Sequence, residues 1–146
     1  MQNITNLVNL YHDHLVIHLK TGDSVSSVSN SSTYNEKDVT QSLEFIHQLI
    51  TQNKYPIRPG CAAIEKKIVL ITGFHKIYYR KSFEYINKFR DFFKSHNYDV
   101  ICRINMNLDE DFIIMCNARF FISSNSFLSK IIKNIVREKG NVIIVP

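Results

Sequence analysis

Residues 67–104 read KIVLITGFHKIYYRKSFEYINKFRDFFKSHNYDVICRI, and this stretch decides the fold. Its two ends, Lys67–Thr72 and Asp99–Ile104, are short runs rich in Val, Ile and Leu, as is typical of strands covered on both faces. Between them, Ser82–His96 carries apolar residues at helical spacing: Phe83, Ile86, Phe89 and Phe93. A strand, a helix and a strand in this order predict a βαβ unit with parallel strands.

The same alternation continues on both sides of this unit. Three further apolar runs predict strands: Leu15–Leu19, Arg119–Ser123 and Asn141–Val145. Three amphipathic segments predict helices: Asp38–Gln52, Asp109–Asn117 and Ser126–Lys139. Asn107 with Glu110 is a capping-box pattern, and Gly140 is typical of a helix end. We therefore expect an α/β fold, a single three-layer Rossmann-like domain over residues 1–146 with a parallel sheet of about five strands and helices on both faces.

Length and composition agree with one globular domain. The chain has 146 residues, of which 45% are hydrophobic and 21% charged, which excludes collagen-like and disordered classes. The formal net charge of +5 raises the question of nucleic acid. However, Lys130, Lys133 and Arg137 recur opposite an apolar stripe, which favours a solvated helix face, and no aromatic-plus-basic RNA-binding motif occurs. A nucleic-acid partner is therefore not expected.

Cysteine usage and hydropathy indicate a reducing compartment. The three cysteines, Cys61, Cys102 and Cys116, are odd in number and widely spaced, and the last two lie in apolar runs typical of buried free thiols. The first residues, MQNITNLVNLYHDH, do not combine a basic region with an apolar stretch, and no apolar run reaches the ~18 residues of a membrane helix. We expect a cytoplasmic protein without a membrane partner.

A polar loop is predicted directly after the first strand, over residues 21–36. Thr21–Asn35 reads TGDSVSSVSNSSTYN, which is rich in Ser and has no apolar period. Such a segment is expected to be mobile without ligand. It follows the carboxyl end of a strand, where open α/β sheets bind their ligands.

Three strand-to-helix junctions carry polar residues beyond what the fold requires. In the first, His18 and Lys20 alternate along the strand and so share a side, where imidazole and ammonium would form an anion clamp. Gly22 and Asp23 would complete the turn. The alternative is a plain strand end with a solvated Lys20.

The second junction contains Gly73, His75 and Lys76, where glycine allows close approach of a ligand and the two side chains could donate hydrogen bonds. A simple turn explains it equally well. The third junction, residues 123–129, reads SSNSFLS and precedes the last predicted helix. Hydroxyls and free N–H groups at a helix N-terminus bind anions, whereas the alternative is N-capping by Ser124 or Asn125.

Several familiar motifs are absent from the sequence. It contains no GxGxxG, no GxxxxGKS and no GxSxG, which removes the main support for dinucleotide enzymes, P-loop ATPases and serine hydrolases. His12, His14 and His18 would have to bridge a loop and a strand to bind a metal. We therefore expect no metal site and no cofactor.

Two stretches in the same order resemble a known family. Residues 16–23, VIHLKTGD, resemble an H-x-R-x-G-D strand end, and residues 109–127, DEDFIIMCNARFFISSNSF, are similar to a D-x-x-x-M/L-x-x-A/C-x-x-F-I-x-x-x-S-S-F-S region. Both motifs belong to the α-1,2, α-1,6 and protein O-fucosyltransferase superfamily, whose two-domain enzymes use GDP-fucose. The likeness runs from about Leu15 to Val145.

The resemblance implies a donor-binding Rossmann half of a GT-B-type glycosyltransferase. Lys20 stands at the position of the family's catalytic arginine, and His18 lies two residues before it. Lysine keeps the charge but loses the planar fork. Asp111 would contact guanine or ribose. The remaining donor-binding and phosphate-binding residues would be Gly22, Asp23, Gly73, His75, Ser124, Asn125, Ser126 and Phe127.

Two functions follow from this resemblance, and they belong to different classes. One is a glycosyltransferase donor domain that binds a nucleotide sugar and transfers its hexosyl or fucosyl group, with Lys20 and His18 as catalytic residues and no metal ion. The other is a non-catalytic or degenerate nucleotide-binding module. In either case the acceptor side would come from a partner chain or another copy, because the resemblance covers only the donor half.

Overall fold

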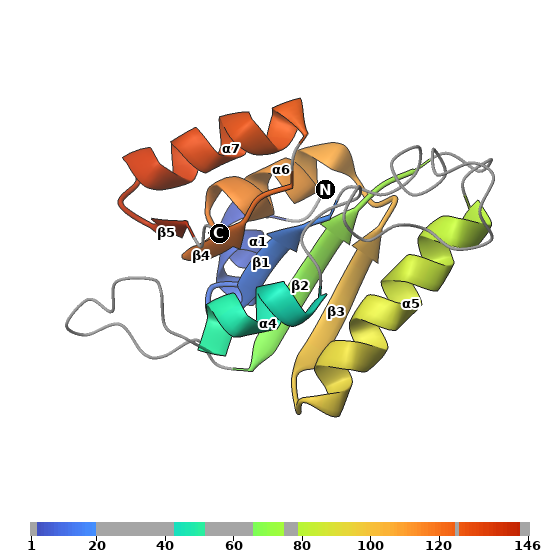
Figure 1. Ribbon diagram of the computed structural model, residues 1–146. Helices are drawn as coiled ribbons and strands as arrows, with labels where there is room; N and C mark the ends of the chain where they lie inside the picture. Colours follow the sequence, from blue (N-terminus) through green and yellow to red (C-terminus); the bar gives the residue numbers. More distant parts are fainter. Residues whose placement is uncertain (1–2, 20–42, 52–65, 75–78, 125, 144–146) are drawn as a thin grey trace.

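Five parallel strands form one sheet at the centre of the computed structural model (Figure 1). The model describes residues 3–19, 43–51, 66–74, 79–124 and 126–143. The strands are β1 (Leu15–His18), β2 (Lys67–Thr72), β3 (Asp99–Ile104), β4 (Phe120–Ile122) and β5 (Val142–Ile143). β1 and β2 are almost continuously apolar and buried, because helices cover both faces of the sheet centre.

The described helices are α1 (Ile4–Leu10), α4 (Leu43–Thr51), α5 (Tyr79–Ser95), α6 (Leu108–Cys116) and α7 (Phe127–Glu138). The N-cap half of the predicted capping box is confirmed at α6, where the Asn107 side chain accepts a hydrogen bond from the Glu110 N–H at 3.0 Å, while the Glu110 carboxylate bonds Arg103. Gly140, after α7, has a φ of 76°, which glycine adopts without strain. Helix α1 was not anticipated from its apolar pattern, and it begins at an Asn3 cap.

The strand order is β3-β2-β1-β4-β5. β1 pairs with β2 on one side and with β4 on the other, so the chain first builds the sheet outward to β3 and then returns to the far side of β1. Right-handed crossovers in opposite directions place their helices on opposite faces. This reversal between β1 and β4 is the position where doubly wound sheets bind ligands at their carboxyl edge.

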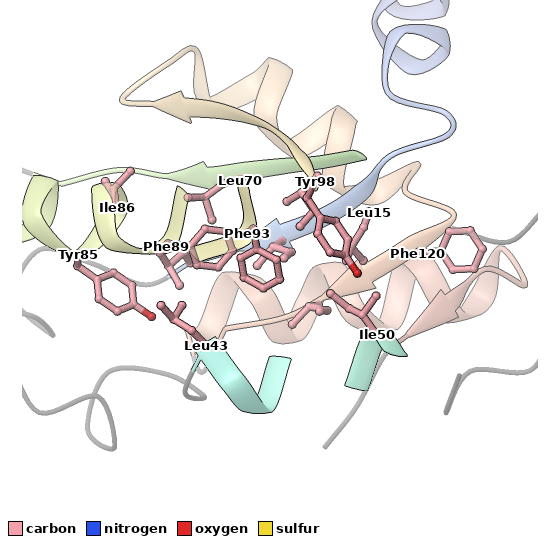
Figure 2. Packing of buried hydrophobic residues seen from close by; sticks show 14 residues of the cluster. Leu15, Leu43, Ile50, Leu70, Tyr85, Ile86, Phe89, Phe93, Tyr98 and Phe120 are labelled. Atoms are coloured by element: carbon pink, nitrogen blue, oxygen red, sulfur yellow. The ribbon is translucent and has the colours of Figure 1, made fainter. Parts of the chain in front are cut away.

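Two apolar layers hold the helices to the sheet. On one face, α4 and α5 pack on the strands through large buried side chains that include Leu43, Tyr85, Phe89 and Phe93 (Figure 2). On the other face, the contacts come from α1, α6 and α7 and include Leu7, Ile114, Ile132 and Val136. The α/β class, the parallel sheet and the helices on both faces are therefore confirmed.

One expectation about the strands is wrong. β3 was predicted to be covered on both faces, but Asp99 and Ile101 are exposed and only Arg103 of its six residues is buried, because it is an edge strand. Residues 21–36, predicted to be a mobile loop, lie outside the described residues. Among the helices that the model describes, none is both long enough and apolar enough to cross a membrane.

Candidate functional site

His18 and Ser124 meet at the carboxyl edge of the sheet. His18 ends β1, and Ser124 follows β4 by two residues. The two strands pair with Ile17 opposite Ile122, so the residues just beyond this pair become neighbours although they are 106 positions apart. The His18 Nδ1 and Ser124 Oγ atoms lie 3.3 Å apart. The sequence predicted this convergence at the carboxyl edge, and the structure shows it for these two residues.

Three serine hydroxyls order the turn between β4 and α7. The N-cap of α7 is Ser126, whose Oγ accepts a hydrogen bond from the Ser129 N–H at 3.1 Å. The alternative in which Ser124 or Asn125 caps this helix is therefore wrong, because the helix begins later along the chain, at Phe127. Ser124 instead braces the turn: its N–H donates to Ser129 Oγ at 2.8 Å, and its Oγ donates to Ser126 Oγ at 3.0 Å.

These bonds decide which donors remain for a ligand. Ser124 Oγ has one hydroxyl proton for its contacts with Ser126 Oγ and His18 Nδ1, and the tautomer of the imidazole sets whether His18 Nδ1 donates or accepts. Ser126 Oγ accepts from both Ser124 and Ser129, which leaves its own proton free to donate. Within the described part of the chain, the first two N–H groups of α7, on Phe127 and Leu128, have no hydrogen-bond partner either.

Burial keeps His18 neutral. Removal from water lowers the pKa of its imidazole from 6.5 to about 4, because a charged ring loses hydration there. At neutral pH, His18 therefore acts as a hydrogen-bonding group without positive charge. An anion at this edge would find one hydroxyl donor and the positive end of the α7 dipole.

The second predicted junction is ordered by a residue that sequence reasoning missed. Asn105, just beyond β3, has a φ of 52°, and its Oδ1 accepts a hydrogen bond from the Phe74 N–H at 2.7 Å. A Cβ atom placed on Gly73 would lie 3.3 Å from that same Oδ1. Close packing against Asn105 thus explains Gly73 without a ligand.

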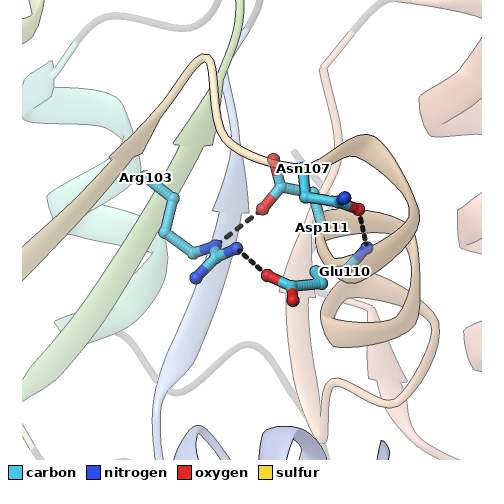
Figure 3. A network of polar contacts seen from close by, with 4 residues as sticks. All are labelled: Arg103, Asn107, Glu110 and Asp111. Carbon is cyan, nitrogen blue, oxygen red and sulfur yellow. Dashed lines mark hydrogen bonds and ion pairs between the residues drawn. The ribbon is translucent and has the colours of Figure 1, made fainter. Parts of the chain in front are cut away.

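Asp111 lies in a buried ionic network at the start of α6 (Figure 3). Its Oδ1 accepts a hydrogen bond from Arg103 Nε at 2.6 Å, and the same guanidinium bonds Glu110 Oε2 at 3.2 Å. The Arg103 Cζ also lies 6.0 Å from the centre of the Tyr11 ring. Burial raises the pKa of the Asp111 carboxyl, and the hydrogen bond and charge of Arg103 oppose that rise.

This network occupies the Asp111 carboxylate, which the resemblance had assigned to a contact with guanine or ribose. A contact to guanine or ribose needs a carboxylate that a ligand can reach, whereas Asp111 is 5% exposed and bonded to Arg103. Arg103 itself was missed by sequence reasoning. The available signal was a lone arginine in the apolar run DVICRI, followed a few residues later by the acidic start of a helix.

The other predicted site residues are divided between two groups. Phe127 is described as the first residue of α7, and it is 80% exposed. Lys20, Gly22, Asp23, His75 and Asn125 lie outside the described residues. Within the ranges that the structure describes, no three His, Cys, Asp or Glu side chains are grouped as metal ligands would be.

Comparison with known proteins adds no relative. The chain matches no family model, no curated protein and no solved structure.

Proposed function

We propose that the chain binds a nucleotide sugar, of the GDP-sugar class, by its diphosphate at the carboxyl edge between β1 and β4. The observation that carries this proposal is the contact between His18 and Ser124 beside the N-terminus of α7. It lies at the reversal of strand order, where doubly wound sheets bind phosphate-bearing ligands. The resemblance to fucosyltransferases supplies the choice of nucleotide sugar.

The diphosphate would be held by donors that the turn leaves unused. Ser126 Oγ offers its proton, and the first N–H groups of α7 point along the helix axis toward the same edge. Each charge-assisted bond of this kind is worth ~1.5–3 kcal/mol. Lys20, two residues beyond His18, would add the full positive charge that the neutral imidazole does not provide.

Two roles remain for His18 in this proposal. In the neutral tautomer with its proton on Nδ1, its Nε2 would accept a hydrogen bond from a ribose or sugar hydroxyl. Its other nitrogen fixes the Ser124 hydroxyl, which in turn positions Ser126. In a transferase, Lys20 would stabilise the charge that develops on the departing diphosphate.

The second candidate is a module that binds the nucleotide sugar without transferring it. The observation that favours it is the pKa of His18 of about 4. An imidazole that is so weakly basic is a poor general base for deprotonating an acceptor hydroxyl. A lysine where the family has arginine points the same way, since it cannot grip a phosphate with two parallel bonds.

Binding is tested with three variants and their controls. Calorimetry should show that Lys20→Ala weakens GDP or GDP-sugar binding at least tenfold, a change of about 1.4 kcal/mol. Ser126→Asp retains an N-cap but places a negative charge against the phosphate, so it should weaken binding at least as much. Ser126→Ala should cost less, because the backbone donors of α7 remain. Lys94→Ala and Ser95→Asp, in the last turn of α5, should bind as wild type does.

The binding measurements test the proposal, and an activity measurement distinguishes a transferase from a binding module. If the wild type binds no guanine nucleotide at millimolar concentration, or if Lys20→Ala and Ser126→Asp bind as tightly as wild type, the proposal is wrong. A thermal-shift screen finds the ligand first, since a nucleotide at 100 times its dissociation constant adds roughly 2.7 kcal/mol of stability. Slow release of free sugar from GDP-sugar by the wild type, abolished in Lys20→Ala, would favour the transferase over the module.

A further inference from the structure

Helices α6 and α7 expose more apolar surface than the other described elements. Five of the ten large apolar side chains exposed among the described residues lie on these two helices: Leu108, Phe112, Phe127, Leu128 and Ile131. Leu108 and Phe127 are 79% and 80% exposed. The helices lie side by side on one face of the sheet (Figure 1), and their exposed apolar side chains together are called here the α6–α7 face. Large apolar side chains that are exposed on neighbouring elements commonly mark a contact with another molecule.

This face carries one exposed charge of each sign near the beginning of its two helices. On α6, Asp109 is exposed and lies three residues before Phe112, on the same side of the helix. On α7, Lys130 is exposed and lies three residues after Phe127 and next to Ile131. Neither Asp109 nor Lys130 forms an ion pair in the part of the chain that the structure describes. The neighbouring Glu110 and Asp111 are already bonded to Arg103.

We infer that the α6–α7 face is the contact surface of a dimer of this chain. Both helices run antiparallel to the strands, and both begin at the carboxyl edge, so Leu108 and Phe127 stand at the same end. A two-fold axis parallel to the helices places α6 of one protomer opposite α7 of the other. Asp109 then faces Lys130 of the second copy, and the same pair recurs by symmetry. The apolar side chains are buried between the two ion pairs.

A second copy fits this face better than an occupant of one charge sign. An anionic membrane or an acidic peptide would be attracted by Lys130 but repelled by the exposed Asp109 on the adjacent helix. A basic partner would meet the reverse conflict. The face is complementary to itself, which is what a symmetric contact requires. This inference is independent of ligand binding at the carboxyl edge.

The experiment measures molecular mass in solution by sedimentation equilibrium over micromolar concentrations at low and high salt. Wild type should form dimers. Asp109→Lys and Lys130→Asp should each weaken dimerisation at least tenfold, because both symmetric contacts then join like charges. An equimolar mixture of the two variants should dimerise again. The first variant is positive at both positions and the second is negative at both, so each contact in the mixed dimer joins opposite charges.

An apolar pair of variants provides the second arm. Ile131→Ser should weaken the dimer at least tenfold, whereas Ile101→Ser, at a similarly exposed position on the edge strand β3, should not. A wild-type chain that stays monomeric throughout overturns the inference. So does a dimer that Ile131→Ser leaves intact, or a failure of the mixed variants to pair. Monomers that bind vesicles of phosphatidylserine and phosphatidylcholine in a Lys130-dependent way would assign the face to a membrane and also overturn it.

Discussion

Replacing Arg103 with methionine should lower the free energy of unfolding by about 3–5 kcal/mol, the usual cost of removing one partner of a buried ion pair. The Asp111 carboxylate would lose its 2.6 Å bond from Arg103 Nε while remaining buried, and Glu110 would lose its bond as well. Urea unfolding at pH 7 measures the change. The loss should shrink as the pH falls and Asp111 becomes protonated, because a neutral carboxyl is less costly to bury.

A double variant and a control variant test whether the lost stability comes from the buried ion pair. The double variant Arg103→Met with Asp111→Leu removes both charges and should recover most of the lost stability, as apolar replacements of buried ion pairs commonly do. Arg80→Met breaks an exposed pair with Glu84 on α5 and should cause no measurable change. If Arg103→Met unfolds at wild-type urea concentration, or if the double variant is no more stable than the single one, the network does not hold the start of α6.

Acidification should destabilise the wild type more than a variant with glutamine at position 18. The pKa of His18 is about 4 in the folded chain against 6.5 for an ordinary histidine, so between these values only the unfolded chain takes up the proton. Stability is therefore complete above pH 6.5 and is lost as the pH falls toward 4. The shift corresponds to about 3 kcal/mol, since each pKa unit is worth about 1.4 kcal/mol.

The measurement is the difference in unfolding free energy between wild type and His18→Gln, followed from pH 7 to pH 4. Other titrating groups contribute equally to both chains and cancel in the difference. Between pH 7 and pH 9 neither form of His18 takes up a proton, so the difference should be constant there. Parallel curves from pH 7 down to pH 4 would contradict the burial of a neutral imidazole at the end of β1.

The sequence predicts the layers of this fold well because its central strands are covered on both faces. The bounds of β2 and β3 coincide with the predicted Lys67–Thr72 and Asp99–Ile104, since each apolar run ends at polar or glycine residues. Helix α1 is not predicted by the sequence pattern, because packing of Leu7 against its neighbours stabilises it more than a regular apolar spacing does. Local pattern carries no information about such contacts.

In the candidate site too, local sequence pattern predicts which residues lie at the edge of the sheet but not which contacts they make. His18 and Ser124 could be expected at the carboxyl edge, because His18 lies near the end of the predicted strand Leu15–Leu19 and Ser124 directly follows the predicted strand Arg119–Ser123. Their hydrogen bond depends on β4 pairing with β1, which the order of elements along the chain does not reveal. The bond between Arg103 and Asp111 likewise requires the turn after β3 to bring α6 back over its own strand. Because Asp111 is buried and bonded to Arg103, it stabilises the fold, whereas the sequence predicted a contact with a ligand.

The central position of β1 has a consequence for the order in which the chain folds. β1 is flanked by β2, about fifty residues later, and by β4, about a hundred residues later. During synthesis the partners on the β2 side emerge first, so β1, β2 and β3 can assemble while the opposite edge of β1 still lacks its neighbour. That edge is closed only when β4 arrives, after a long loop has been ordered. The contact between His18 and Ser124 therefore cannot form before β4 has been synthesised, and a nascent chain that ends before β4 lacks it.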